Sequence, residues 1–280
     1  MSKTKSLKKQ NRHVFYHVIM FIWSLIVLFP LYVLVINSLK TRLSIYINPF
    51  GIPKTFNFKN YSTIFKDSDF LIYFKNSFIV VILSLLVMTI FSALAAYAFA
   101  FWKKRQARVL FFFMIAGMML PIKIASIRIL EIMKFLNLLN TIWSLIPIYV
   151  AMGIPIGIFV LTEFIREIPL ELSQAAIIDG ANRFSIFKMV IVPLIKPALS
   201  TVAIYNLVPF WNDLWFPLIF ISDEKSKTLL LGVTRLFGQY QTDWSKVLAV
   251  LTLSAIPVLF LYLTMSKQFI EGVTAGAVKG

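Results

Sequence analysis

Long apolar stretches alternate with short polar stretches along almost the whole chain. A helix that crosses a bilayer needs about 20 mostly apolar residues. Six stretches meet this requirement, at about residues 14–38, 74–102, 109–129, 141–165, 198–221 and 247–265. The pattern therefore predicts an all-α integral membrane protein with six transmembrane helices.

The segment between the fourth and fifth predicted spans, residues 166–197, is amphipathic rather than uniformly apolar. Pro169 suits the first turn of a helix, because the N–H it lacks has no partner there. Gly180 predicts the end of that helix, since glycine readily takes the left-handed conformation. A second short apolar-periodic run continues to Pro193 and Pro197. We expect two short helices joined at Gly180, too polar to span a bilayer, which a partner outside this chain could hold.

The composition supports a membrane protein. Apolar residues make up 59% of the chain, charged residues 14%, and the mean hydropathy is +0.82, whereas soluble domains are about half apolar and a quarter charged. The net charge of +16 raises the question of nucleic acid, but no nucleic-acid-binding module is visible. The basic residues flank apolar segments, as expected beside anionic lipid headgroups. We therefore expect the lipid bilayer, and no nucleic acid, as a partner.

Basic clusters predict the orientation. Lysines and an arginine precede the first span, and a dense cluster at 103–108 follows the second. The positive-inside rule places both clusters in the cytoplasm, so six spans leave both termini cytoplasmic. Close helix packing is predicted by the Gly153-x-x-x-Gly157 pair in the fourth span.

The fifth predicted span carries polar groups within an apolar segment, namely Asn206, Trp211, Asn212 and Asp213. Such groups at membrane depth usually face a bundle interior or a wet cavity. Amides, carboxylates and aromatic rings are also the groups that bind sugars, so these four are candidates for a substrate path. The alternative is an interfacial tryptophan belt with Asp213 reaching the outer headgroups.

No catalytic or metal-binding motif is visible in the sequence. His-Glu-x-x-His, Gly-x-Ser-x-Gly and paired carboxylates within one span are absent. His13 and His17 have no nearby carboxylate, so neither a metal nor another cofactor is expected. The chain also lacks a Walker A sequence, so it is not expected to be an enzyme, and any ATP-Mg that drives it would be bound by a partner subunit.

The 166–197 segment resembles the signature loop of bacterial ABC-importer permeases. That loop reads Glu-Ala-Ala, three residues, Gly, nine residues, and an aliphatic-x-aliphatic-Pro ending, and the spacing matches throughout, although Gln174 stands where the family usually has Glu. In the family the loop docks into a cleft on the ATPase subunit. The resemblance therefore implies these ATPase-coupling residues: Glu171, Gln174, Ala175, Ala176, Asp179, Gly180, Ala181, Pro193 and Pro197.

A second resemblance narrows the substrate. Ser38-Leu-Lys, Pro53-Lys-Thr-Phe, Asn60-Tyr-Ser-Thr-Ile-Phe65 and Phe74-Lys-Asn-Ser77 are similar to the carbohydrate branch of these permeases, as is the Trp-Asn-acidic run at 211–213. The 272–280 tail resembles that of the maltose-permease type whose C-terminus reaches the ATPase dimer. Residues 222–246 match the loop that the family extends towards the external binding protein.

The resemblance implies the type I ABC-importer permease fold, with a cytoplasmic coupling helix between spans four and five. Its parts would be residues 1–70 (cytoplasmic N-terminus, first span and extracytoplasmic loop), the permease domain 71–266 with the coupling loop 166–197, and the cytoplasmic tail 267–280. The implied partners are a second homologous permease, ATPase subunits, an extracellular sugar-binding protein and a sugar, in the bacterial cell membrane. The alternatives are a permease for an amino acid, peptide or polyamine, and a secondary transporter, for which no ion relay or internal repeat is seen.

Overall fold

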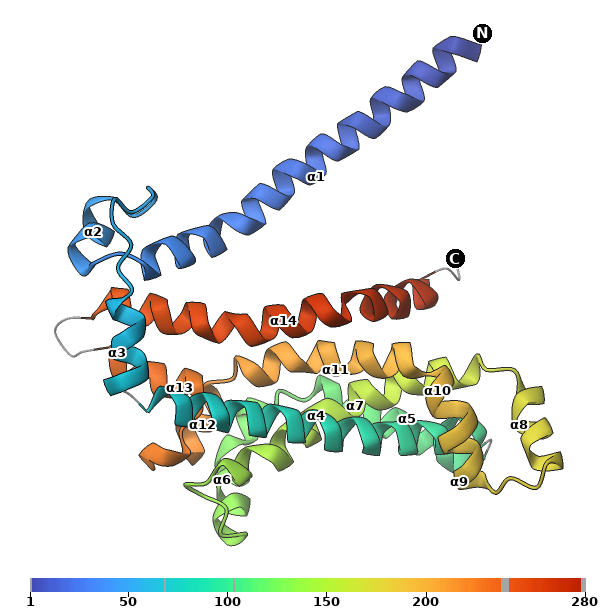
Figure 1. Cartoon of the computed structure of the whole chain (residues 1–280). Coiled ribbons are helices and arrows are strands. Elements are labelled where there is room, and N and C mark those ends of the chain that lie inside the picture. The colour runs from blue at the N-terminus through green and yellow to red at the C-terminus, as the bar shows by residue number, and fades with distance from the viewer. Residues whose placement is uncertain (1, 68, 103, 238–241, 278–280) are drawn as a thin grey trace. The chain divides into compact units, whose positions relative to one another are not determined.

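The computed structural model describes residues 2–67, 69–102, 104–237 and 242–277, which form helices and connecting loops without any strand (Figure 1). The chain divides into two compact units. One comprises Met1–Ser68 and Val233–Leu253, and the other comprises Asp69–Gly232 and Ser254–Gly280. Lys103 of the predicted basic cluster and residues 278–280 of the predicted tail lie outside the described residues.

The first unit begins with α1 (Ser2–Ser38), whose side chains from Phe15 to Tyr32 are all exposed. This is the surface expected of a helix that meets lipid. Two short helices follow, α2 (Arg42–Ile47) and α3 (Lys59–Asp67). The turn η6 (Thr234–Leu236) and the start of α14 (Trp244–Ala277) complete this unit.

A buried lysine organises the loop after α1. The Lys40 side chain is 1% exposed, and its ammonium donates hydrogen bonds to Asn37 Oδ1 at 3.0 Å and to the Asn48 carbonyl at 2.8 Å. Burial lowers the pKa of Lys40 below its usual value. Asn60 of α3 donates to the carbonyls of Ser38 and Lys40, each at 3.0 Å. These polar bonds fix α3 against the end of α1.

The second unit is built on the long helices α4 (Phe70–Phe101) and α7 (Leu145–Arg166), which pack together more extensively than any other pair (Figure 1). The predicted Gly-x-x-x-Gly contact is confirmed. A Cβ on Gly153 would lie 2.7 Å from Met88 Cγ, and one on Gly157 would lie 2.7 Å from Ser92 Cβ. Glycine at both positions therefore lets the two backbones approach closely.

The remaining elements of the second unit are shorter or are shared with the first. They are α5 (Arg105–Ala116), η1 (Gly117–Met119), η2 (Ile122–Ala125), α6 (Ser126–Phe135), η3 (Ile142–Ser144), α8 (Leu170–Ile178), α9 (Arg183–Ile186), η4 (Phe187–Ile191, a π-helical turn), α10 (Val192–Leu194), α11 (Lys196–Trp211), α12 (Trp215–Phe220), η5 (Glu224–Ser226), α13 (Leu229–Val233) and the end of α14.

Four helices are long and apolar enough to cross a bilayer: Phe15–Ser38, Phe70–Phe101, Ile142–Arg166 and Trp244–Thr264. Two further pairs meet the requirement together. Arg105–Met119 with Ile122–Phe135 is bent by 83°, and Arg183–Leu194 with Lys196–Trp211 is bent by 73°. The described part of the chain thus holds four spans by length and composition, or six if each bent pair is one span.

The third predicted span, 109–129, is wrong as a continuous helix. α5 ends at Ala116, the turns η1 and η2 follow, and α6 begins only at Ser126. Pro121 lies between the two turns; in a continuous helix it would lack the N–H to donate and its ring would clash with the preceding turn. The chain therefore turns sharply here instead of running on as one rod.

The fifth predicted span, 198–221, is also wrong as a continuous helix. α11 ends at Trp211 and α12 begins at Trp215. The Asp213 carboxylate accepts hydrogen bonds from the backbone N–H groups of Trp215 and Phe216, each at 3.2 Å. The side chain thus satisfies donors at the start of a new helix, so the break is a built feature.

The predicted loop and the predicted tail both contain helix, and residues 238–241 of the loop lie outside the described residues. The predicted outer loop 222–246 contains α13, in which Leu229, Leu231 and Val233 are buried. The predicted tail is part of α14, which continues to Ala277.

Candidate functional site

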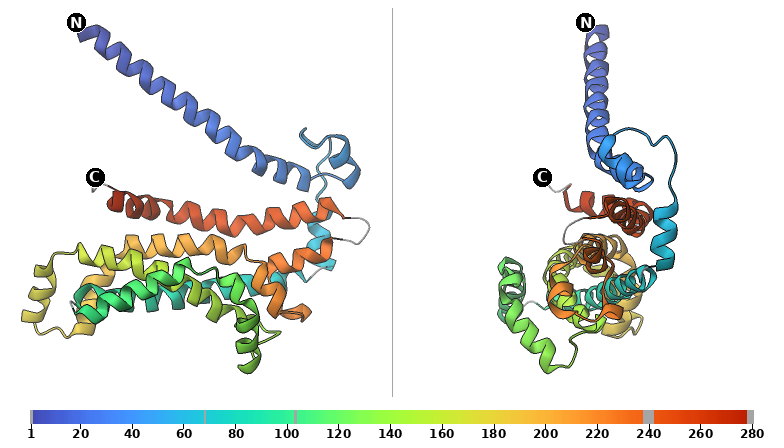
Figure 2. Two further views of the ribbon diagram at one scale, coloured as in Figure 1. Left: turned by 180° about the vertical axis from the view of Figure 1, so that it is seen from behind. Right: turned by 90° about the vertical axis from the view of Figure 1, so that its left-hand side faces the viewer.

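The 166–197 segment lies at the end of the second unit that is remote from α6 and α12 (Figure 2). α7 ends at Arg166, and the extended backbone of Pro169 separates it from α8. Because proline disfavours a helical residue before it, the chain turns away from the bundle here. A groove of about 430 Å³ lies at this root, between the end of α7, the start of α8 and the α10–α11 corner.

Gly180 ends α8 as the sequence predicts. Its φ is +82°, a left-handed conformation that glycine adopts without strain. The Ala181 N–H donates to the Ala176 carbonyl at 2.9 Å, and the Gly180 N–H donates to the Ile177 carbonyl at 3.0 Å. These two bonds form a Schellman motif. The direction in which the chain leaves α8 is therefore set by Gly180.

α9 is held by α4, whereas α8 is not packed against the bundle. Asn182 caps α9 by accepting a hydrogen bond from the Ser185 N–H at 2.9 Å. The Tyr97 hydroxyl on α4 donates to the Arg183 carbonyl at 3.3 Å, and its ring lies 5.3 Å from that of Phe187. In α8 only Ser173 is buried. α8 is thus connected to α4 by way of α9.

The predicted coupling residues lie on the surface of this segment. Their positions are shared between α8, the Gly180 turn and the α10–α11 corner. Exposed side chains or backbone are found at Glu171, Gln174, Ala175, Asp179, Gly180 and Pro193, and half-buried ones at Ala176, Ala181 and Pro197.

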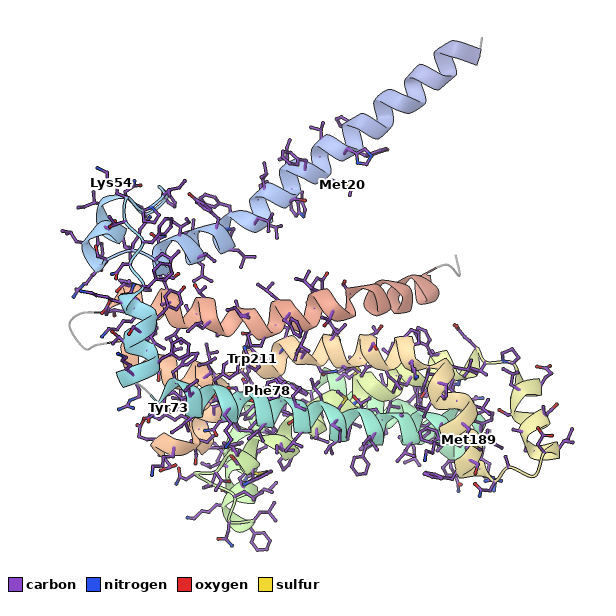
Figure 3. The ribbon with its side chains drawn as sticks, in the orientation of Figure 1. Met20, Lys54, Tyr73, Phe78, Met189 and Trp211 are labelled. Atoms are coloured by element: carbon purple, nitrogen blue, oxygen red, sulfur yellow. The ribbon has the colours of Figure 1, made fainter. Side chains whose placement is uncertain are left out.

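Large apolar side chains on the same segment were missed as site residues. Ile178 is 86% exposed, and Ile177, Phe184 and Met189 are exposed as well; Met189 lies at the α9 end of the unit (Figure 3). The sequence shows them as an apolar periodicity, which normally means burial inside the chain. The length of α8 could have revealed them. A helix of nine residues has few neighbours of its own that could bury its apolar side chains.

The polar residues of the predicted fifth span cluster at the opposite end of α11. The Tyr149 hydroxyl on α7 donates to Asp213 Oδ2 at 3.0 Å, and the Tyr149 ring stacks on Phe210 with centroids 4.9 Å apart. Tyr149 is 1% exposed. Asp213 therefore joins α7 to the α11–α12 break.

The other three candidates differ in what they can still bind. Asn206 is buried and donates to the Val202 carbonyl at 2.9 Å. The Trp211 indole, labelled in Figure 3, is buried and donates to the Ser254 carbonyl at 3.0 Å. Asn212 has an exposed side chain. The structure thus brings Trp211, Asn212 and Asp213 together, while Asn206 lies further along α11 against Gly153. Within the described residues, no cluster of three His, Cys, Asp or Glu side chains could hold a metal ion.

Straight and bent helices that are long and apolar enough to cross a bilayer make this a helical membrane protein. Residues 88–271 match the family described as binding-protein-dependent transport system inner membrane component. This match covers more than half of the chain, and the chain belongs to that family.

Relatives by sequence match over most of their length. The protein ORF2 of Caldicellulosiruptor sp. (strain Rt8B.4) is named as a candidate ABC transporter permease protein. It is 38% identical over 281 residues, with 100% of both chains covered. The melibiose/raffinose/stachyose import permease protein MelC of Bacillus subtilis (strain 168) is 32% identical, covering 90% of this chain and 91% of MelC. The diacetylchitobiose uptake system permease protein NgcG of Streptomyces coelicolor is 29% identical, covering 94% and 88%.

A solved structure shares the fold. It is that of a bacterial ABC transporter involved in the import of the acidic polysaccharide alginate, and it matches with a TM-score of 0.80 at 21% identity over 93% of this chain and 97% of that chain. The same type of transporter in complex with an alginate pentasaccharide-bound periplasmic protein gives a TM-score of 0.68 at 17% identity. The chain therefore has the all-helical fold of an ABC-importer permease.

Proposed function

We propose that this chain is the permease subunit of an ATP-driven importer that moves a sugar or oligosaccharide delivered by an extracellular binding protein. The observation that carries the proposal is the exposed apolar side of α8, with Ile178 86% exposed on a segment that the rest of its own unit leaves uncovered. In a family of binding-protein-dependent transport components, this segment is best suited to dock a motor subunit.

The sugar substrate is supported by the relatives and by the substrate-path candidates. MelC and NgcG are named for oligosaccharides. At the α11–α12 break, Asn212 offers an exposed amide and Asp213 holds the break in place. We assign Asn212 to substrate contact, and Asn206, Trp211 and Asp213 to the wall and positioning of the path.

Coupling would run from ATPase subunits, which bind ATP-Mg, through residues 171–181 into the membrane bundle. Closure of the ATPases would move α8, and the Tyr97 contacts with α9 would pass the movement to α4. A second homologous permease would complete a central path between the two subunits. The physics is a two-state alternating-access equilibrium that ATP biases from a distance.

Cross-linking tests the docking. The chain has no cysteine, so a maleimide-linked photo-crosslinker on Ile178→Cys would be the only such label on it. In membranes from producing cells, we expect a cross-linked product that mass spectrometry identifies as a Walker A-containing ATPase. Ile127→Cys on α6, 71% exposed, is the matched control and should capture no ATPase. Capture at both positions, or at neither, would refute docking at α8.

Surface labelling tests the orientation, in which six spans place both termini and residues 166–197 in the cytoplasm. An impermeant maleimide added to intact spheroplasts should label Arg128→Cys on α6 and spare Asp179→Cys until the membrane is opened. The reverse pattern would invert the topology. Both side chains are exposed, so lack of label reports the side of the membrane and not burial.

Uptake tests the substrate class. Cells that express the full transporter should accumulate labelled oligosaccharides, and unlabelled sugars should compete with them. Competition by amino acids, peptides or polyamines instead of sugars would assign the permease to another solute. Uptake that persists when the ATPase is deleted and collapses with the proton gradient would identify a secondary transporter.

A further inference from the structure

A polar pocket of about 300 Å³ lies where α4 ends, α5 begins and α7 ends. Its volume is at the lower end of the range for small-molecule sites, about 300–1,000 Å³. Three of its lining residues are basic: Lys104 and Arg108 at the start of α5, and Arg166 at the end of α7. None of the described residues that line it is acidic. The charge of the pocket selects an anion.

Among the residues that the structure describes, two of the three cations have no carboxylate partner. Lys104 and Arg108 form no ion pair with a carboxylate in the described part of the chain. Arg166 does have one, since its Nη1 lies 2.7 Å from Glu163 Oε1, and its guanidinium also lies 5.2 Å from the centroid of the Phe111 ring. These contacts hold Arg166 in place, while Lys104 and Arg108 remain available to an anionic ligand.

The surroundings of the pocket are those of a membrane boundary. Phe99 and the half-exposed ring of Trp102 line it beside the cations. Beyond the pocket, α5 exposes a run of large apolar side chains that includes Val109, Phe112 and Phe113. Tryptophan and basic residues gather at the headgroup level of membranes. A ligand with a phosphate and adjoining acyl chains would match both the pocket and this apolar run.

We propose that this pocket binds the phosphate of an anionic phospholipid, with Lys104 and Arg108 as the ligand-binding charges. Basic pockets between transmembrane helices on the cytoplasmic side suit such headgroups. The inner leaflet as the source rests on the orientation proposed above, whereas binding itself does not. Arg166 lies three residues before Pro169, so the bound headgroup sits at the root of α8 and steadies the segment proposed to meet the ATPase.

Lipid binding to the purified, delipidated transporter complex tests the proposal, measured by native mass spectrometry. Phosphatidylglycerol should bind more tightly than phosphatidylcholine. Each basic residue strengthens attraction to an anionic membrane roughly fivefold. Lys104→Gln combined with Arg108→Gln should therefore weaken phosphatidylglycerol binding about 30-fold and leave phosphatidylcholine unchanged. The matched control, Lys188→Gln combined with Lys196→Gln, removes two exposed charges from the same end of the unit, outside the pocket, and should retain the preference.

Each other outcome overturns a defined part of the proposal. If the pocket variant keeps the preference for phosphatidylglycerol over phosphatidylcholine, or if the control variant loses it equally, the pocket is not the binding site. Inorganic phosphate that binds as tightly as phosphatidylglycerol would replace the lipid with a soluble phosphate ester. If the double variant does not assemble, Lys104→Gln alone should weaken phosphatidylglycerol binding about fivefold, and no change would refute the proposal. Binding does not require transport, so this failure is distinct from failure of the proposed import function.

Discussion

The Tyr149 hydroxyl donates a hydrogen bond of 3.0 Å to the Asp213 carboxylate. This bond joins α7, which packs along α4, to the break between α11 and α12. Asp213 also accepts two backbone N–H bonds at the start of α12. One carboxylate thus fixes both the break and its distance from α7. The sequence predicts Asp213 as a contact for a solute, and in the structure its carboxylate bonds other parts of the same chain.

Tyr149→Phe should therefore weaken the structure without altering its packing. The substitution removes one hydrogen bond to the half-buried Asp213 carboxylate, and a bond to a charged group stabilises by about 2 kcal/mol. It retains the stack on Phe210. We expect a lower thermal midpoint for the purified transporter complex and slower uptake at saturating substrate, because the α11–α12 break is less well positioned.

The matched control is Tyr205→Phe on α11, where the side chain is 58% exposed. It removes the same hydroxyl from the neighbouring helix and should leave the midpoint within experimental error. An equal loss of stability in both variants would show that the Asp213 bond has no special role.

A glycine contact on α7 leads to a rescue experiment. An added Cβ at position 157 would overlap Ser92 on α4. Overpacking of a tight helix contact destabilises by about 1–3 kcal/mol, so Gly157→Ala should lower the amount of folded protein in the membrane and its thermal midpoint. Ser92→Gly removes the atoms that the new methyl group would meet. The double variant should therefore recover most of the loss.

A double-mutant cycle measures this coupling. If the two substitutions are simply additive, α4 and α7 do not meet through this pair. Gly117→Ala supplies the comparison, because a Cβ there meets only Pro155 Cγ at 3.9 Å, an ordinary contact. It should have little effect on the midpoint.

The features that sequence predicted well are those set by local chemistry. Long apolar runs identify helices at membrane depth because the backbone there must satisfy its own hydrogen bonds. Gly180 could be identified as a helix end because few other residues adopt its φ of +82°. Both the apolar helices and the helix end at Gly180 could be predicted because each depends mainly on residues close to it in the sequence.

The features that sequence missed depend on distant partners. Pro121 interrupts a predicted span, whereas Pro155 lies inside the continuous helix α7, and the sequence pattern alone does not distinguish the two prolines. Asp213 breaks the fifth span because it finds donors on α12 and on Tyr149. The exposure of Ile178 depends on the absence of a covering helix in its unit. The periodicity of apolar residues predicts an apolar helix face, but it does not show whether another part of the same chain buries that face.

Gly180 offers a test of coupling that does not disturb packing. A Cβ at this position would meet no atom within 4 Å, so a side chain fits, but the backbone has φ +82°. Residues other than glycine pay about 1–2 kcal/mol for that conformation, and β-branched valine is among the least suited. We expect Gly180→Val to abolish uptake while membrane insertion persists, because the Schellman turn that aims α8 is lost.

Gly180→Asn is the discriminating control, since asparagine tolerates the left-handed region. It should retain a large part of the uptake of the parent protein. Uptake that is normal in Gly180→Val, or lost equally in both variants, would contradict a role for the backbone conformation at this turn.

Gln174 stands where the ABC-importer loop that residues 166–197 resemble usually has glutamate. The side chain is exposed in the middle of α8, so Gln174→Glu should not change the stability of the permease by more than about 0.5 kcal/mol. We expect the added carboxylate to tighten ATPase docking by up to about fivefold, the upper range of an exposed ion pair. The measurement is transport-coupled ATP hydrolysis by the reconstituted complex at several ATPase concentrations.

Ionic strength separates a charge effect from a change in α8 itself, because exposed pairs are screened by salt. The gain from Gln174→Glu should therefore shrink at high salt. Gln106→Glu introduces the same charge on the exposed side of α5, outside residues 166–197, and should change docking less. If Gln174→Glu leaves coupling unchanged at low salt, docking rests on the shape and apolar contacts of α8, with Ile178 as the first residue to substitute.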